Sequence, residues 1–304
     1  MIGMDTRQLR AFLTVIETGG ISAAADKLGY AQSSVSDQLR GLERDLGVAV
    51  LNRTSVGTVA TEAGARLLPY ARQLLDLDGE MRRTVSGARP LLRIGALQSL
   101  ADEWLPEILT AFDHGAAGPG TAADVILTVT SRDRLAAELS QGRLDATFTL
   151  DSGPPATGPS AVVGYSRVVL VAAPDHPLAS VRPVTLDAVR ETEFLVTEIG
   201  CIYRQCFDEF GRDLGPSLRI GMITGSLNAL RRLAVNGRGA ALLPRFAVAT
   251  ELDAGDLVML DLREGLADLT IEARWRPGLG PAEKPLQALV ELTQRYSPER
   301  ELVG

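Results

Sequence analysis

The sequence predicts an α/β protein made of a small N-terminal helical unit and a larger C-terminal unit of alternating strands and helices. Apolar residues recur at helical spacing in the first 50 residues, whereas short apolar runs separated by helical stretches begin near Leu91. With 304 residues, the chain has room for two or three compact units, taking roughly 100–200 residues per unit. Charge divides in the same way, because residues 1–90 carry 11 Lys+Arg and 10 Asp+Glu, against 20 and 28 in the remainder.

Composition excludes several classes of protein. No run of about 18 apolar residues and no charged-then-apolar leader is present, so we expect a cytoplasmic protein without a membrane partner. Cys201 and Cys206 are too few for a disulfide framework and lack zinc-ligand companions. His114 and His176 are the two histidines, and the chain contains no G-x-S-x-G, H-E-x-x-H or phosphate-loop motif. We therefore expect no enzyme activity, no metal and no cofactor.

Three short helices are predicted in the first 50 residues. The first spans 7–17 and ends at Gly19-Gly20; the second spans 22–28, with Ser22 as its N-cap. The third spans about 32–46, and its spacing predicts a buried face of Val35, Leu39, Leu42 and Leu46. This pattern is typical of a helix-turn-helix.

The other face of the third helix is crowded with hydroxyl and amide side chains. Such groups hydrogen-bond to base edges and phosphates in the major groove. The alternative is that this polar face is only solvated. The wing sequence that follows the helix argues against this alternative. The candidate DNA contacts on this helix are Gln32, Ser33, Ser34, Ser36, Gln38 and Arg40.

A two-stranded wing and a long helix follow the third helix. The wing consists of Val48–Asn52 and Thr58–Ala60, with Arg53 expected at its tip, where an arginine reaches the minor groove or a phosphate. The long helix begins near Thr61 and ends near residue 87. Its apolar seam predicts a dimerisation helix, and a two-fold dimer would bind a palindromic site. The seam residues are Leu67, Ala71, Leu74, Met81 and Val85, with Asp78 interrupting them.

The last two hundred residues predict two α/β lobes around a cleft. Strands at 91–96, 125–130 and 146–150 form the first lobe, and the Pro/Gly-rich stretch 152–164 is expected to be a linker. Strands of the second lobe are expected near 166–173, 194–197, 219–223 and 239–243. A strand at 269–275 and a helix at 283–296 are expected to return to the first lobe.

Ligands of open α/β sheets bind beyond the carboxyl ends of the strands, where helix N-termini point inward. Several positions of this kind carry hydroxyls or amides, which suit a small anion such as a carboxylate. Taken singly, Ser99, Ser131 and Ser226 fit helix N-caps better than ligand contacts, and their convergence through the fold favours a pocket. Arg132 is the candidate charge partner. The candidate effector contacts are Gln98, Ser99, Leu100, Thr130, Ser131, Arg132, Glu198, Gly200, Cys201, Ile202, Ser226 and Asn228.

The N-terminal stretch resembles the DNA-binding domain of LysR-type transcriptional regulators. The resemblance rests on RQLRAF, AAADKLG, Gln-x-x-x-Ser followed by LE-x-x-LG, the wing arginine, and TEAG before the long helix. Weaker matches to the effector domain of that family are RIGALQSL, PDHPLA, TEIGCIYR and NGRGAALLPRFAV. The resemblance implies that the third helix and Arg53 contact DNA. Three positions depart from the family pattern: Ala31 at the N-cap, Asp37 facing phosphates, and Leu51 in place of a wing phenylalanine.

The resemblance also implies the domain organisation and the partners. Residues 1–60 would form the winged helix-turn-helix, 61–90 the linker and dimerisation helix, and 91–304 an effector domain of periplasmic-binding-protein type. Within that domain, lobe I would comprise about 91–162 and 269–304, and lobe II about 163–268. The expected partners are double-stranded promoter or operator DNA, a small-molecule effector, and the chain itself as a homodimer or homotetramer.

Two alternatives remain open from the sequence. Cys201 and Cys206 suggest a thiol-based redox sensor, although positions i and i+5 of one helix point in different directions. A solute-binding protein without DNA function would share the fold of residues 91–300. The N-terminal DNA-reading pattern argues against it. Our leading interpretation is a LysR-type regulator whose promoter binding responds to a small, anionic effector.

Overall fold

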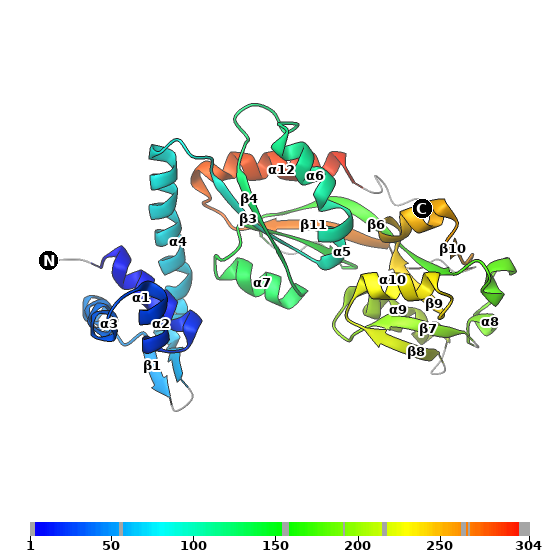
Figure 1. Ribbon diagram of the computed structural model, residues 1–304, viewed down its shortest axis with the longest axis horizontal. Coiled ribbons are helices and arrows are strands. Elements are labelled where there is room, and N and C mark those ends of the chain that lie inside the picture. The colour runs from blue at the N-terminus through cyan, green and yellow to red at the C-terminus, as the bar shows by residue number, and fades with distance from the viewer. Residues whose placement is uncertain are drawn as a thin grey trace.

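The computed structural model describes residues 4–54, 57–153, 158–190, 192–214, 218–262, 266 and 268–297. A small helical unit lies at the N-terminal end, and a long α/β unit extends from it (Figure 1). Helix α4 (Glu62–Val85) stands between the two units. The predicted α/β class, with a helix-turn-helix followed by a two-lobed unit, is confirmed.

The N-terminal unit packs three helices and a two-stranded sheet around one core. Phe12, Val35 and Leu42 are fully buried there. The predicted third helix has the predicted bounds. The elements are α1 (Thr6–Thr18), α2 (Ile21–Leu28), α3 (Gln32–Leu46), β1 (Leu51–Thr54) and β2 (Gly57–Ala60).

Two predictions for these helices are wrong. Helix α2 begins at Ile21 with Gly20 as its N-cap and no side-chain capping bond, so Ser22 lies inside the helix and is not its cap. Leu46, predicted to be buried, is 39% exposed. It is the last residue of α3 before Gly47, where the chain turns away in a left-handed conformation. The buried stripe of α3 therefore ends one helical turn early.

The wing rests on the turn between α1 and α2. The Thr58 amide donates to the Gly19 carbonyl at 2.7 Å. Gly57 has a φ of +134°, and a Cβ there would lie 2.8 Å from the same carbonyl oxygen. A glycine at position 57 is therefore required both for the backbone conformation and for the close approach.

The start of α4 is fastened to the chain that leads into the wing. The Thr61 hydroxyl accepts from the Gly64 amide at 3.0 Å and donates to the Ala49 carbonyl at 2.8 Å. A Cβ at Gly64 would overlap the Val50 carbonyl oxygen. The Thr61-Glu62-Ala63-Gly64 sequence therefore fixes the direction in which α4 leaves the N-terminal unit.

The α/β unit is built on one continuous mixed sheet with strand order β4-β3-β5-β11-β6-β9-β7-β8, and β10 pairs with β6. Strands β3, β4 and β5 are parallel, as are β7, β8 and β9, whereas β11 and β6 run antiparallel to their neighbours. The strands are β3 (Leu91–Ala96), β4 (Asp124–Val129), β5 (Ala146–Asp151), β6 (Ser160–Ala172), β7 (Glu193–Thr197), β8 (Arg219–Thr224), β9 (Ala240–Pro244), β10 (Val258–Met259) and β11 (Asp268–Trp275).

Helices cover both faces of the sheet. In lobe I, α6 and α12 lie on one face and α7 on the other (Figure 1). The chain changes direction at Trp104, so the segment that follows β3 forms two helices and not one. The helices are α5 (Gln98–Glu103), α6 (Leu105–Asp113), α7 (Arg132–Ser140), α8 (Leu186–Arg190), α9 (Ile202–Leu214), α10 (Leu227–Val235), α11 (Ala249–Ala254) and α12 (Glu283–Arg295).

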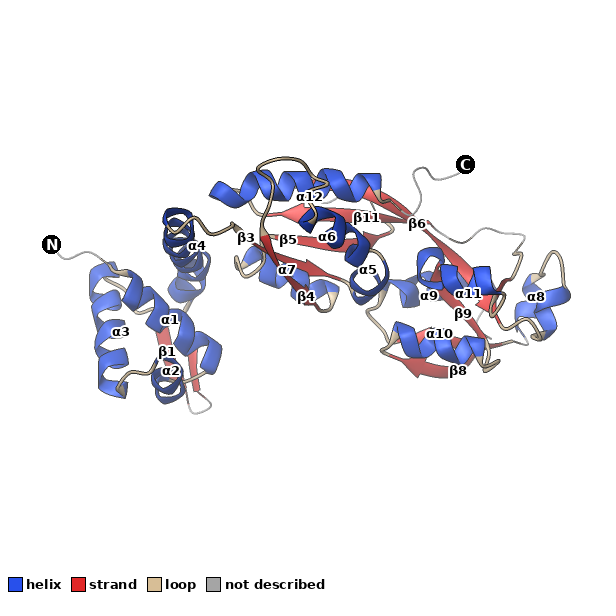
Figure 2. Ribbon diagram, turned by 45° about the horizontal axis from the view of Figure 1, so that its top comes forward, coloured by secondary structure: helices blue, strands red, loops and turns tan. Residues whose placement is uncertain are grey.

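The two lobes share strand β6. It pairs with β11 as far as Arg167 and with β9 from Val168 onward, so one strand runs through both lobes (Figure 2). The expected linker over 152–164 is therefore partly wrong, since its residues from Ser160 onward are strand, and residues 154–157 lie outside the described part. The apolar run 168–172 of this strand is buried, and it is the part of β6 that continues into lobe II.

Among the helices of the described segments, none combines the length and apolar character that crossing a bilayer requires.

Candidate functional site

The polar face of α3 lies open at the surface of the N-terminal unit. Gln32, Ser33 and Arg40 are exposed, and Ser34, Ser36 and Gln38 are half-buried. A shallow depression runs between this face and the start of α1, lined by Asp5, Arg7, Gln8, Ser33, Ser34, Asp37 and Gln38. Sequence reasoning did not include Arg7, whose exposed guanidinium pairs with Asp5 at 3.2 Å. The predicted helix-borne DNA contacts thus share one accessible surface.

The first turn of α3 has no side-chain cap. Ala31 holds the N-cap position with φ −69° and ψ 145°, and it has no side chain that can accept a hydrogen bond. No side chain therefore caps the N–H groups of the first turn, which lie beside Ser33 and Ser34 at the positive end of the helix dipole. Such an end suits a phosphate group.

Asp37 holds Arg40 against the helix surface. The Asp37 carboxylate and the Arg40 guanidinium are 3.2 Å apart, and both side chains are largely exposed, at 72% and 66%. Arg40 also donates to the Ser36 carbonyl at 3.4 Å. The carboxylate neutralises a cation on the face that we assign to DNA.

Replacing Asp37 by asparagine is therefore expected to strengthen DNA binding. The free Arg40 gains a phosphate contact, so affinity should rise several-fold on specific and random duplex alike, and the slope of log K against log[salt] should steepen by about 1. Fluorescence anisotropy across a salt series measures both. Asp45→Asn, on an exposed part of α3 near its C-terminal end, is the matched control. Unchanged affinity and slope in Asp37→Asn would place this face away from the phosphates.

Arg53 lies in the wing, although not in the turn at its tip as predicted. It belongs to β1 and pairs with Thr58 of β2, one residue pair before the turn. Its side chain and residues 55–56 lie outside the described residues. A strand position one pair from the turn still places Arg53 at the distal end of the wing.

An exposed apolar stripe runs along α4. Tyr70, Leu74, Leu77 and Met81 are 64%, 43%, 51% and 55% exposed and follow one another at spacings of 4, 3 and 4 residues. The predicted seam is therefore shifted at its N-terminal end. Leu67 and Ala71 pack into the core of the DNA-binding unit instead, because the start of α4 serves that core.

A cavity of about 470 Å³ opens between the two lobes. It is formed where β3, β4 and β7 end and α5, α7 and α9 begin. Nine of the predicted contacts line it: Gln98, Ser99, Thr130, Ser131, Arg132, Glu198, Gly200, Cys201 and Ile202. The sequence reasoning missed eight others: Leu97, Val129, Asp133, Thr197, Ile199, Tyr203, Gly225 and Leu227.

Three predicted contacts do not line this cavity. Leu100 is completely buried in the core, because the short helix α5 turns that side inward. The Ser226 hydroxyl accepts from the Ala229 amide at 3.2 Å and so serves as the N-cap of α10. Asn228 donates to Asp102 at 3.3 Å. The cap interpretation is therefore correct for Ser226.

Hydroxyl groups from both lobes meet in the cavity. Ser99 of α5 and Tyr203 of α9 share a buried hydrogen bond of 2.8 Å. Burial raises the pKa of Tyr203 above its usual range, so this hydroxyl stays protonated. Thr197 Oγ1 is buried and has no hydrogen-bond partner in the described part of the chain. Thr197 is also one of the residues that line the cavity.

Ion pairs on α5 and α10 connect the lobes at the side of the cavity. Arg231 contacts Glu103 at 2.8 Å, beside the Asn228–Asp102 bond. Arg231 is itself held by Asn228 and Glu251. These contacts and the Ser99–Tyr203 bond hold the lobes together in the present conformation.

The two cysteines have different environments. Both are free thiols; Cys201 lines the cavity and is partly exposed, whereas Cys206 is 4% exposed in the core. Burial raises the pKa of Cys206 to about 11, so little thiolate forms there near neutral pH. Cys206 therefore lacks the low-pKa, accessible character that redox-sensing thiols have.

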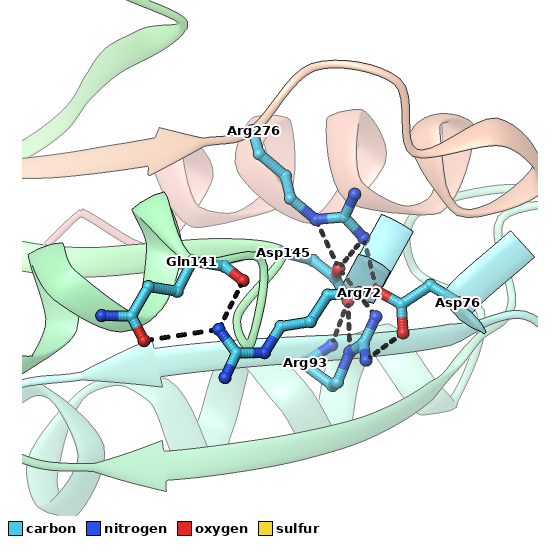
Figure 3. Close-up of polar contacts among 6 residues, drawn as sticks. All are labelled: Arg72, Asp76, Arg93, Gln141, Asp145 and Arg276. Carbon is cyan, nitrogen blue, oxygen red and sulfur yellow. Dashed lines mark hydrogen bonds and ion pairs between the residues drawn. The ribbon is translucent and has the colours of Figure 1, made fainter. Parts of the chain in front are cut away.

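Charged side chains fasten α4 to lobe I (Figure 3). Asp145, 2% exposed, accepts from the Arg93 amide at 2.8 Å and from Arg276 Nη2 at 2.7 Å. Asp76 of α4 contacts Arg93 at 2.7 Å and Arg276 at 3.4 Å. Arg72 of α4 donates to the Gln141 carbonyl at 2.9 Å. Helix α4 and lobe I therefore share a partly buried ion network.

Two family profiles match this chain. Residues 6–65 match the bacterial regulatory helix-turn-helix protein of the lysR family, and residues 86–297 match the LysR substrate-binding domain.

The chain belongs to the LysR family. It is 29% identical to the HTH-type transcriptional regulator YwqM of Bacillus subtilis over 96% of this chain and 99% of that one. It is 30% identical to the RuBisCO operon transcriptional regulator of Allochromatium vinosum, covering 87% of each. Among solved structures it is similar to full-length LysG from Corynebacterium glutamicum with the effector Arg bound, at 25% identity and a TM-score of 0.68, covering 97% and 99% of the two chains.

The LysR-type regulator therefore combines a DNA-binding helix-turn-helix with an effector-binding domain, and it acts as an oligomer. The members of this family are transcription regulators and not enzymes. The redox-sensor and solute-carrier alternatives are not favoured.

Proposed function

We propose that this regulator reads its operator with the polar face of α3 and with Arg53, and that a small carboxylic acid bound between the lobes controls this binding. The observation that carries the proposal is the convergence of nine predicted positions on one cavity between the lobes. We further propose that residues 1–60 read DNA, 61–90 join the protomers, and 91–304 bind the effector, with lobe I over about 91–162 and 269–304 and lobe II over about 163–268. The protein would act in the cytoplasm, on promoter DNA.

The chemistry of α3 supports a division between base and phosphate contacts. Ser34 and Gln38 lie in the middle of the accessible face, where side chains reach base edges, and Gln38 Oε1 has no partner within the described residues. Arg53, at the wing, suits a phosphate or the minor groove.

Ser34→Ala and Gln38→Ala should weaken binding to the regulator's own upstream region more than binding to random duplex. Each lost base contact costs about 1–3 kcal/mol of discrimination. Arg53→Ala should lower affinity on both duplexes and reduce the salt slope by about 1. Competition gel shifts measure these ratios. If all three variants lose affinity equally on both duplexes, the assigned roles are wrong.

The cavity lining supports a carboxylate that also carries a hydrogen-bond donor. Helices α7 and α9 begin at the cavity and point amide groups toward it, and Thr197 offers an unpaired hydroxyl. Glu198 and Asp133 add negative charge to the lining, so a ligand with a donor group satisfies both sides. Arg132, the predicted charge partner, is already paired with Asp151 at 2.5 Å, and it would contribute as part of that pair.

Alkylation of Cys201 reports occupancy of this cavity. Near pH 8, iodoacetamide should modify Cys201 at least about 100-fold faster than Cys206, because the raised pKa of Cys206 suppresses its thiolate. Carboxylic acids that bind in the cavity should slow the modification of Cys201. Thr197→Val keeps the shape but removes the hydroxyl, so it should weaken this protection about tenfold. Thr110→Val, an exposed change on α6, is the control. Failure of a broad panel of mono- and dicarboxylates to protect Cys201 would refute the carboxylate.

A further inference from the structure

A second cavity, of about 560 Å³, adjoins the Arg132–Asp151 pair. Helix α7 and strands β5 and β11 form most of its wall, and Pro69 and Gln73 of α4 complete it. Arg132 and Asp133 line both cavities. The second cavity is thus bounded by the effector unit on one side and by the linker helix on the other.

The sheet face beneath this cavity is polar where a buried sheet face is usually apolar. Thr147 and Thr149 of β5 are 2% and 6% exposed, and they pair with Arg274 and Glu272 of β11. Directly opposed residues of paired strands point to the same face. Glu272 is 1% exposed and contacts Arg274 at 2.7 Å.

Two arginines in this cavity have buried donors that are not satisfied. Arg132 uses Nη1 for Asp151, and its Nη2 is buried with no hydrogen-bond partner in the described segments. Arg274 donates to Glu272 through Nη2, and its Nε is likewise buried without a hydrogen-bond partner among the described residues. Both guanidinium groups approach the same oxygen, Asp151 Oδ2, at 2.5 and 3.8 Å. Two arginines that line one cavity and approach the same carboxylate therefore each keep one buried N–H group without a partner among the described residues.

We propose that this cavity is a second ligand site, which takes a small carboxylate held between Arg132 and Arg274. Buried polar donors normally have partners, and charge-assisted bonds to a planar carboxylate satisfy two N–H groups at once. Asp151 accepts from Arg132 Nη1 and from the Gly153 amide, whereas Arg132 Nη2 and Arg274 Nε make no hydrogen bond to it or to any other group of the described residues. Burial opposes ionisation of Asp151, but bonds from Gly153 and Arg132 lower its pKa, so it remains an acceptor.

A ligand in this cavity would contact α4, the helix that leads to the DNA-binding unit. Pro69 lies inside α4 and has no amide hydrogen, so one hydrogen bond of the helix is missing at the wall of the cavity. Gln73 follows one turn later, next to Arg72, whose guanidinium is bonded to Gln141. A ligand here contacts α4 near the point where the helix bends most easily.

The test uses the full-length protein with acetate, succinate and inorganic phosphate as probes, at constant ionic strength. Trp275 follows Arg274 in β11, and its side chain packs against the core on the other face of the sheet. A carboxylate bound at Arg274 should therefore change its fluorescence saturably, and Trp275→Phe should remove that change. Arg274→Gln should weaken the carboxylate response about tenfold or more. Arg167→Gln, which removes an exposed arginine outside the cavity, should leave it intact.

Two variants separate this site from the interlobe cavity. Thr197→Val should retain the Trp275 response while losing Cys201 protection, and Arg274→Gln should show the reverse. Arg274→Lys keeps the positive charge but removes Nε, so it gives the same answer if the glutamine variant does not fold. A wild-type response in a folded Arg274 variant, no saturable response to either carboxylate, or tighter binding of phosphate would each overturn the proposal.

Discussion

Leu77→Asp should convert the regulator into a monomer and weaken its binding to operator DNA by about 100-fold or more. Leu77 lies in the middle of the exposed stripe on α4, between Leu74 and Met81. In a two-fold dimer each carboxylate would be placed in an apolar interface without a partner, which is costly. A monomer binds one half-site and loses the effective-concentration gain of a linked second site, which is about 10²–10⁴.

Light scattering and gel shifts measure this result. Val181→Asp, an equivalent change at a residue that is 37% exposed and lies in lobe II away from α4, should keep the oligomer and the affinity. A dimer of unchanged stability in Leu77→Asp would show that another surface joins the protomers.

Asp145→Asn should destabilise the effector unit by about 3–5 kcal/mol, the cost of breaking a buried ion pair from one side. The change is nearly isosteric, so its effect is on charge. It leaves Arg93 and Arg276 with Asp76 as their shared anion. Burial opposes the protonated form of Arg93, yet its bonds to Asp76 and Asp145 raise its pKa. Asp76, at 2.7 Å, still favours the charged form of Arg93 when the charge of Asp145 is removed.

Denaturant unfolding followed by tryptophan fluorescence measures this loss, because both tryptophans, Trp104 and Trp275, lie in the effector unit. Asp113→Asn removes one partner of an exposed ion pair with Arg89 and should cost less than about 1 kcal/mol. An equal, small effect of both substitutions would mean that the network does not stabilise the junction. A large loss in Asp145→Asn with intact DNA binding would show that the DNA-binding unit folds independently.

The sequence predicted the parts of this molecule that depend on local pattern. The period of apolar residues predicts α3 over about 32–46, and Val35, Leu39 and Leu42 of its predicted stripe are buried, whereas Leu46 is not. The positions of the effector-site residues could be predicted equally well, since a ligand of an open sheet binds where strands end and helices begin. This rule alone brought Thr130, Arg132 and Glu198 to one cavity.

What the sequence did not predict depends on tertiary contacts. Leu67 and Ala71 follow the same helical period as Leu74, and only packing shows that they face the core of their own unit. Tyr203 was missed because an aromatic residue in an amphipathic helix normally indicates core. The second cavity was not predicted, because it depends on the pairing of Glu272 with Thr149 across strands 120 residues apart in the chain.

The most direct test of the central claim is a competition experiment with purified wild-type protein at moderate salt. A labelled duplex carrying the regulator's own upstream region competes with a scrambled duplex of the same length and base composition. If α3 reads base edges as an inserted recognition helix, the upstream duplex should bind at least about 10³-fold more tightly. Equal affinity for the two duplexes would contradict the account, because it would mean that the protein contacts phosphates and reads no sequence.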